Sequence, residues 1–351
     1  MREKALRYRW ELFLVVVLVA VVIVNVNISE FYFGEQNFIN MFQLSIEKLI
    51  VAVIMTFVII NGEIDLSVAS VMAFSACVLA ALHQGGAVPF ELALAIALLA
   101  GAFAGLVQGA FVAFMGLPSL VVTLAGLIGF RGAGRILVED NSIGDFPDWF
   151  DTLGQEPLVG RFSFALIFFL VLIVVAGIVL HRTAFGRSVF VIGNNANVAR
   201  FSGVNVARDK LMIMTASGFF AGLAGVLFAS RLGSVRGDLS VGFELDIITI
   251  VLLGGVSIFG GSGTMVGVGL AILIVLNIRN GLGLANIDQN TQTGVIGCLL
   301  ILSVLVPNLV ARLAGSWRAA RAGERGPPAA GGRDEGGDTP RHEPDLHPTR
   351  S

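Results

Sequence analysis

Four carboxylates beside long apolar stretches are the candidates for transport chemistry in this chain: Glu63, Asp65, Glu244 and Asp246. Each is expected at the end of a predicted membrane span and not in its middle. A carrier driven by protons or other ions usually needs ionisable groups inside its spans, where they are costly to bury and functional. The positions of these four residues therefore favour a pathway whose energy comes from a separate source.

No pattern typical of catalysis accompanies them. Cys77 and Cys298 lie inside apolar runs far apart in the sequence, and the histidines lack the spacing of metal ligands. The glycine cluster at residues 254–264 lacks the Gly-Lys-Ser/Thr of a phosphate-binding loop. We therefore expect no catalytic residue, no metal, no cofactor and no nucleic-acid partner.

Glu63 and Asp65 lie in the segment Gly62-Glu63-Ile64-Asp65-Leu66-Ser67, between two apolar runs. A carboxylate facing lipid costs about 2.5–3.5 kcal/mol on insertion scales, so we expect both at an interface or facing the bundle interior. Two interpretations stay open. Either Asp65 or Ser67 caps the next helix and satisfies its free N–H groups, or the acids act directly in transport.

The most basic internal segment spans residues 181–210 and, by the positive-inside rule, faces the cytoplasm. Asn195 or Asn197 is predicted to cap a short helix over residues 198–201, which Gly203 ends in the left-handed conformation. The segment is either a docking surface for a soluble partner or a connector held at anionic lipid headgroups. Its charged residues are Arg182, Arg187, Arg200, Arg208, Asp209 and Lys210.

Composition places these residues in an integral membrane protein. The chain has 351 residues, of which 55% are hydrophobic and 14% charged, whereas soluble domains carry roughly 25% charge. The apolar runs predict an all-α polytopic fold of about ten transmembrane helices, some of them interrupted. The predicted spans are about 10–28, 38–60, 68–82, 90–115, 119–138, 162–180, 211–230, 245 into the glycine cluster, 265–278 and 291–306.

Glycine accounts for 43 residues, above the usual ~7%, which predicts close helix packing and helix breaks. Gly101, Gly105 and Gly109 are spaced by four and predict a close helix contact. The cluster at 254–264 predicts a break or tight turn at the inner membrane surface. Its candidate break residues are Gly254, Gly255, Gly260, Gly261 and Gly263.

Charge distribution gives the orientation. Residues 1–9 are basic and predicted to be cytoplasmic, whereas the loop 139–160 contains acids and no base and is predicted to lie outside. That loop is either an ordinary solvated loop or a landing surface for a soluble partner. Arg131 and Arg135 are expected to snorkel or to pair with the acids of this loop. We expect a permease domain at 10–312, a disordered tail at 313–351, and both termini in the cytoplasm.

Several ordered motifs carry a resemblance to a known family. They are Gly-Glu-Ile-Asp-Leu-Ser (62–67), Leu-Pro-Ser-Leu-Val-Val-Thr-Leu (117–124), Arg131-Gly132, Phe-Gly-Arg (185–187), Ile-Gly-Asn-Asn (192–195), Ala-Arg-Phe-Ser-Gly-Val-Asn-Val (199–206) and Gly-Phe-Glu-Leu-Asp (242–246). Over about residues 10–310 the chain resembles the permease subunit of bacterial ABC importers of the ribose, xylose and galactose type. Glu63, where that family commonly has Gly, and the cluster 254–263 resemble the rhamnose and autoinducer-2 branch.

The resemblance implies a multi-pass protein of the bacterial inner membrane that imports a monosaccharide and has no ATPase site of its own. The finer expectation for the substrate is a rhamnose-like sugar. Its implied partners are cytoplasmic ATPase subunits, a periplasmic or lipid-anchored sugar-binding protein, a second copy of the permease or a homologous permease, and membrane lipid. The resemblance assigns to the ATPase-coupling loop the residues Gly186, Arg187, Gly193, Asn194, Asn195, Ala199, Arg200 and Gly203.

Ser67, Glu63, Asp65, Glu244, Asp246 and the five cluster glycines remain pathway or helix-break candidates. Two other functions remain as alternatives. One is a branched-chain amino-acid permease of a related importer type, and the other is a self-standing secondary carrier.

Overall fold

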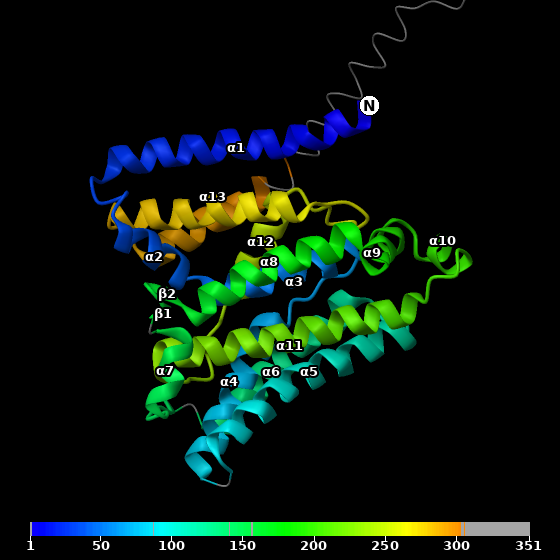
Figure 1. Cartoon of the computed structure of the whole chain (residues 1–351). Helices are drawn as coiled ribbons and strands as arrows, with labels where there is room; N and C mark the ends of the chain where they lie inside the picture. Colours follow the sequence, from blue (N-terminus) through cyan, green and yellow to red (C-terminus); the bar gives the residue numbers. More distant parts are fainter. Residues whose placement is uncertain (1, 87, 140, 156, 303–304, 306–351) are drawn as a thin grey trace, which may run out of the picture. The chain divides into compact units, whose positions relative to one another are not determined.

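The computed structural model describes residues 2–86, 88–139, 141–155, 157–302 and 305, and the predicted tail at 313–351 lies outside them (Figure 1). The described chain is almost entirely helical. Residues 289–302 form a further helix after α13. The other elements are α1 (Arg2–Ile28), α2 (Glu35–Gln43), α3 (Ile46–Ile60), α4 (Val68–Gly85), α5 (Phe90–Phe114), α6 (Ser119–Val138), α7 (Asp148–Gly154), β1 (Pro157–Val159), β2 (Phe162–Ser163), α8 (Phe164–Arg182), α9 (Ala184–Asn194), α10 (Ala196–Phe201), α11 (Val206–Leu232), α12 (Phe243–Leu253) and α13 (Met265–Leu284).

Within the described residues, seven helices are long and apolar enough to cross a membrane: α1, α4, α5, α6, α8, α11 and α13. Helices α2 and α3 meet at a bend of 55° and can form an eighth span. The expected number of about ten is therefore not confirmed. Helix α12 has 11 residues, about 16 Å of helix, which is short of a ~30 Å bilayer core. The last predicted span, 291–306, is only partly inside the described residues.

Helix α3 lies at the centre of the fold. All of its residues are buried, and it contacts α8, α11, α12 and α13. A helix that is apolar on every side lies either in a protein core or in a membrane span. Beyond its first turn, α3 is apolar except for Thr56, whose hydroxyl donates to the Ala52 carbonyl at 2.9 Å. Its composition therefore suits both settings, and the surrounding helices bury it.

Glycines allow α5 and α11 to approach closely, as the four-residue spacing on α5 predicts. A Cβ on Gly101 would lie 2.7 Å from the Gly218 carbonyl oxygen, and one on Gly109 would lie 2.9 Å from the Met214 Cβ. A Cβ on Gly218 would in turn lie 2.6 Å from the Gly105 nitrogen. The two backbones are therefore in direct contact, which is the packing that small residues permit between membrane helices.

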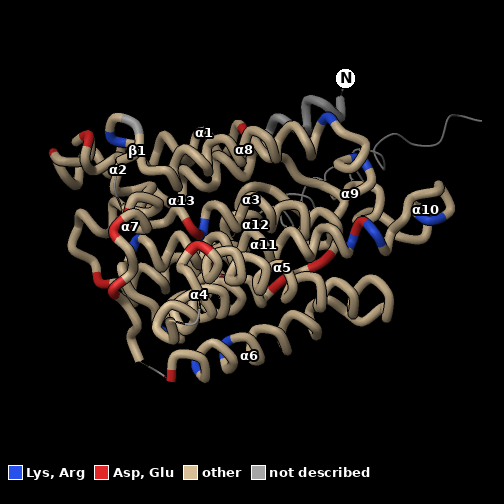
Figure 2. Tube along the Cα trace, turned by 60° about the horizontal axis from the view of Figure 1, so that its bottom comes forward, with Lys and Arg blue, Asp and Glu red and all other residues tan. Residues whose placement is uncertain are grey.

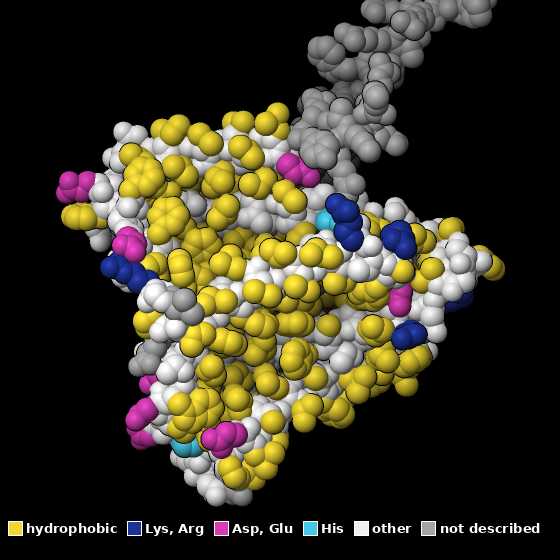
Figure 3. Space-filling model, viewed as in Figure 1, with side chains coloured by type: hydrophobic (Ala, Val, Ile, Leu, Met, Phe, Trp, Pro, Cys, Tyr) yellow, Lys and Arg dark blue, Asp and Glu magenta, His cyan; other side chains and the backbone are white. Residues whose placement is uncertain are grey.

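The two ends of the bundle carry different structures. Helix α7 and the antiparallel pair β1–β2 lie at one end, whereas α9, α10 and the start of α1 lie at the other (Figure 1). Hydrophobic side chains cover most of the visible face between the ends (Figure 3). Most charged positions lie towards the ends, with a few inside the bundle (Figure 2). The cytoplasmic assignment of the α9–α10 end stays a prediction from the positive-inside rule.

Substituting Ala for Gly218 tests the α5–α11 contact. We expect Gly218→Ala to destabilise the protein by about 1–3 kcal/mol, because the added methyl group overpacks against the α5 backbone. The measurement is the midpoint of thermal unfolding in detergent. Gly129→Ala on α6 is the matched control, since a Cβ there meets nothing within 4 Å. Equal midpoints for the two variants would contradict the contact.

Candidate functional site

Helices α9 and α10 have well-defined ends. The Asn195 side chain caps α10 by accepting hydrogen bonds from the N–H groups of Asn197 (3.0 Å) and Val198 (3.2 Å). Gly203 follows the helix with φ of +83°. The predicted short helix, its Asn195 cap and its left-handed glycine are thus confirmed, while Asn197 lies inside α10. These ends hold a compact pair of helices between α8 and α11.

Two glycine-containing turns meet the C-terminal end of α9, in what we call the glycine junction (Gly62, Gly260 and Gly261 of the turns, and Gly193 of α9). A Cβ on Gly193 would overlap the Ile60 carbonyl oxygen and lie 2.6 Å from the Gly261 nitrogen. The Gly261 N–H itself donates to the Ile60 carbonyl at 2.8 Å. The predicted coupling residue Gly193 therefore contacts two elements: the C-terminal end of α3 and the loop after α12.

Asn194 adds a side-chain link at the same place. Its Nδ2 group donates to the Gly261 carbonyl at 3.2 Å and to the Phe190 carbonyl at 3.1 Å. Gly186, near the start of α9, packs its backbone against the Leu180 carbonyl of α8. Two of the predicted coupling residues thus fasten α9 to its neighbours.

The remaining predicted coupling residues divide between the inside and the surface. Ala199 is fully buried and packs with Ile192 and Val206, whereas Arg187 and Arg200 are exposed. Phe201 is 92% exposed, although it is a large apolar residue at the end of a basic helix. We did not select Phe201 from the sequence. A signal for it does exist in the sequence: on a helix of six residues that buries Ala199, the neighbouring Arg200 and Phe201 point elsewhere and are available to a partner.

Helices α3 and α12 end alike. Each is followed by a glycine with φ of +83°, Gly62 and Gly255, and each closes in a Schellman motif. The closing hydrogen bonds run from Glu63 N–H to Val58 O (3.1 Å) and from Val256 N–H to Val251 O (3.4 Å). The two short helices α3 and α12 therefore stop in the same way. The last carbonyl of α3, on Ile60, accepts from the Gly261 N–H at the glycine junction, whereas the Leu253 carbonyl of α12 accepts from the Trp10 indole.

The glycine cluster forms the predicted helix break. Gly255, Gly260, Gly261 and Gly263 all have positive φ, at 83°, 82°, 73° and 152°. Gly254 differs, because its φ is −63° and a Cβ on it would lie 2.7 Å from the Val268 Cα. The four glycines with positive φ are thus required by their backbone conformation. Gly254 is required by its close packing against Val268.

Both carboxylates of the 62–67 turn have partners. Glu63 forms an ion pair with Lys210 of α11. Asp65 accepts from the Ser67 N–H at 2.9 Å, from the Ser67 hydroxyl at 2.6 Å and from the Ser217 hydroxyl at 2.8 Å. Ser67 stands at the N-cap of α4, but its side chain accepts no hydrogen bond from that helix. The capping interpretation is therefore wrong in detail: Asp65 stabilises the turn before α4.

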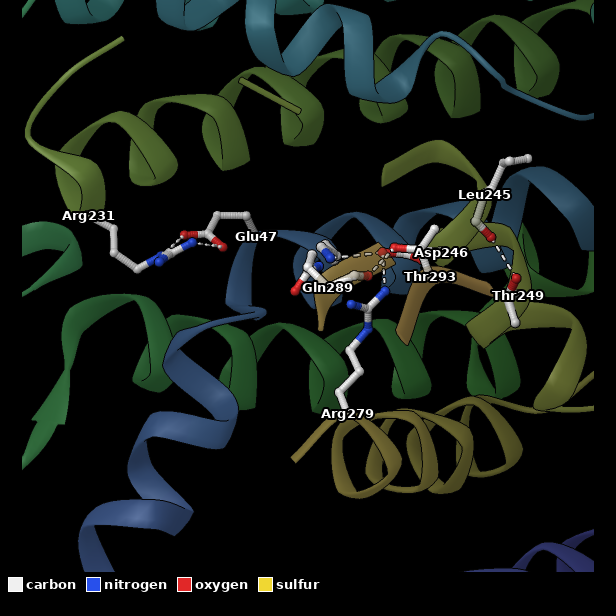
Figure 4. A network of polar contacts seen from close by, with 9 residues as sticks. Glu47, Arg231, Leu245, Asp246, Thr249, Arg279, Gln289 and Thr293 are labelled. Carbon is white, nitrogen blue, oxygen red and sulfur yellow. Dashed lines mark hydrogen bonds and ion pairs between the residues drawn. The ribbon is translucent and has the colours of Figure 1, made fainter. Parts of the chain in front are cut away.

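Glu244 and Asp246 belong to a buried charge cluster at the opposite end of α3 and α12. Figure 4 shows Asp246 of this cluster with Arg279, and Glu47 with Arg231. Asp246 pairs with Lys48 at 2.8 Å and with Arg279 at 2.6 Å. Glu244 lies 3.5 Å from Arg131, which corrects the expectation that Arg131 snorkels or pairs with the 139–160 loop. These acids are therefore paired with bases and are not free in a pathway.

The same cluster includes a pair that the sequence analysis missed. Glu47 is 1% exposed and accepts from Arg231 at 2.7 Å and 3.4 Å. Glu47 and Lys48 lie within the apolar run 38–60. Because the run is apolar on average, a prediction based on its mean hydropathy gives no weight to one acid and one base inside it. Glu47 is thus a further acid beside the four expected at span ends, and it lies inside a predicted span. Acids in the first turns of α3 and α12 also complement the positive ends of these helices.

The arrangement joins packed helix ends and buried ion pairs into one continuous set of contacts. Among the described residues, no group of three or more His, Cys, Asp or Glu side chains is placed to hold a metal ion. Helices α3 and α12 instead run between the buried charge cluster and the glycine junction. A displacement of α9 would therefore reach the far end of the bundle through two short, packed helices.

Comparison with known proteins gives a consistent result. Residues 37–304 match the family described as "Branched-chain amino acid transport system / permease component". The chain is 36% identical over 262 residues to the autoinducer 2 import system permease protein LsrD of Yersinia enterocolitica, covering 73% of this chain and 78% of that protein. It is 32% identical over 313 residues to LsrD of Photorhabdus luminescens, covering 85% and 91%. No solved structure matches the chain significantly.

Removing one partner of a buried pair tests the charge cluster. We expect Arg231→Ala to destabilise the protein by about 3–5 kcal/mol, because Glu47 would be left as an uncompensated buried charge. Thermal unfolding in detergent measures the loss. Arg161→Ala is the control, since Arg161 pairs with Glu35 at a surface where both side chains are more than half exposed, and such pairs contribute about 0–1 kcal/mol. A midpoint for Arg231→Ala as high as that of the control would show that the cluster is dispensable.

Proposed function

Since the chain belongs to the family of branched-chain amino acid transport system permease components, we propose that it is the membrane-spanning subunit of a binding-protein-dependent ABC importer for autoinducer-2 or a similar sugar. The family assignment makes it a transport component of the bacterial inner membrane. The substrate rests on the relatives, which are named as autoinducer 2 import permeases. A rhamnose-like sugar is the next candidate by chemical similarity.

The observation that carries the proposal is the α9–α10 segment. Its arginines and Phe201 are exposed at the outside of the bundle. At its inner side, Gly193 lies against the end of α3 and the loop after α12. Aromatic residues and arginine are enriched at protein–protein interfaces relative to the rest of the surface. We therefore assign this segment to the contact with a cytoplasmic ATPase subunit, where ATP is hydrolysed.

The coupling follows from the same geometry. ATP binding draws the ATPase subunits together, and the seated α9–α10 segment moves with them. The backbones of α9 and α3 are in direct contact at the glycine junction, so α3 and α12 move with α9. The pathway then changes between two discrete arrangements. The full importer contains a second copy of this chain or a homologous permease, and a sugar-binding protein docks at the end that carries α7.

Reconstitution tests this function. The chain, its candidate ATPase and the soluble receptor are placed in proteoliposomes, and uptake is compared for autoinducer-2, rhamnose and leucine. We expect ATP-dependent and receptor-dependent uptake of autoinducer-2. Selective leucine uptake would instead indicate a branched-chain amino-acid importer. Uptake by the chain alone, driven by an ion gradient, would contradict the proposal.

Two variants test the assigned docking segment. We expect Arg200→Glu and Gly203→Val each to lower uptake about tenfold, equivalent to ~1.4 kcal/mol, while the protein still inserts into the membrane. The first reverses a docking charge, and the second strains a residue at φ +83°. Uptake and ATP hydrolysis are measured on the same vesicles.

Matched controls lie at the other end of the bundle. Arg161→Glu reverses an equally exposed charge, and Gly160→Val places a side chain at φ +62° in equally open space. Because the receptor is proposed to dock at this end, the controls are compared by the amount of ATPase that co-purifies with the permease. We expect both controls to keep the wild-type amount, and Arg200→Glu and Gly203→Val to lower it. Wild-type uptake by Arg200→Glu and Gly203→Val would rule out docking through this segment.

A further inference from the structure

Helix α11 holds both acids of the 62–67 turn. Lys210 pairs with Glu63, and the Ser217 hydroxyl donates to Asp65 at 2.8 Å. Lys210 and Ser217 are seven residues apart, which is two helical turns, so they project from the same face of α11. The turn is thus attached to one rigid helix at two points.

Helix α6 holds the residue between those acids. The Ile64 N–H donates to the Ser119 hydroxyl at 3.1 Å, and the Ile64 carbonyl accepts from the Thr123 hydroxyl at 3.1 Å. Most of the α6 surface is exposed in this chain. The 62–67 turn therefore joins the long buried helix α11 to a helix at the periphery of the subunit.

The first turn of α11 is also tied to the docking segment. Asp209, next to Lys210, accepts a hydrogen bond from the Ser188 hydroxyl of α9 at 2.5 Å. Helix α10 leads into α11 through residues 202–205, and Asn205 caps α11 by accepting from the Arg208 N–H at 3.0 Å. Adjacent residues of α11 thus contact α9 and the 62–67 turn.

We propose that the Lys210–Glu63 ion pair is the positioning contact through which movement of the α9–α10 segment reaches the 62–67 turn and, through Ile64, helix α6. This inference rests on the proposed transport function. The pair suits the role, because its side chains are only 20% and 10% exposed, so water screens it little. Neither residue is assigned a contact with the substrate.

Charge reversal and exchange test this role. The variants are Lys210→Glu, Glu63→Lys and the double variant with the charges exchanged, each assembled with the ATPase and receptor in proteoliposomes. We expect each single variant to import about tenfold fewer substrate molecules per ATP hydrolysed. The double variant should recover at least half of the wild-type ratio, because exchange restores the attraction.

The ratio of import to hydrolysis separates coupling from simple loss of protein, and the amount of assembled complex is measured alongside it. If the reversed variants do not assemble, Glu63→Gln replaces them, since it removes the charge and keeps the shape; the same loss in ratio is expected. Matched controls are Arg161→Glu and Glu35→Arg at the exposed ion pair. They should assemble with the ATPase in wild-type amounts, which shows that charge reversal as such does not prevent assembly.

The outcomes distinguish a failure of this inference from a failure of the proposed transport function. Wild-type vesicles without ATP-driven import would overturn the proposed function itself. Wild-type vesicles with such import, combined with unchanged ratios in the single variants or no recovery in the double variant, would overturn the role of Lys210–Glu63 alone.

Discussion

The fold depends on one contact that tolerates no side chain. At Gly193 the backbone of α9 lies against the Ile60 carbonyl, where the Gly261 N–H also donates. The C-terminal end of α3, the loop after α12 and the docking segment therefore share one small volume. Interiors packed at this density respond to displacement by switching between arrangements and not by gradual deformation. This contact joins the α9–α10 segment directly to the end of the central helix α3.

Electrostatics secures the other end of the same helices. The acids at the starts of α3 and α12 complement the positive helix ends and are paired with bases from α6, α11 and α13. Helices α3 and α12 are thus held by ion pairs at their N-terminal ends and by backbone contacts at their C-terminal ends. The Trp10 indole adds α1 to the second end by donating to the Leu253 carbonyl at 3.2 Å. Both short helices are therefore fixed at each end by contacts with other elements.

Local chemistry made part of this structure predictable from the sequence. The Asn195 cap, the left-handed Gly203 and the glycine face on α5 each depend on residues close together in the chain or on a simple period. The charge pairs were not predictable, because Glu47 and Arg231, or Glu244 and Arg131, meet only after the helices pack. The shortness of α12 was also missed, since its apolar composition matches that of a full span.

The most direct test of the account is the number of substrate molecules imported per ATP hydrolysed by a Gly193→Ala complex, measured beside wild type. The added methyl group would have to displace the Ile60 carbonyl or the Gly261 nitrogen. The account predicts a complex that assembles and hydrolyses ATP but imports at least about tenfold less per ATP, a change of ~1.4 kcal/mol. A Gly193→Ala complex with the wild-type ratio would contradict the claim that this contact carries the coupling.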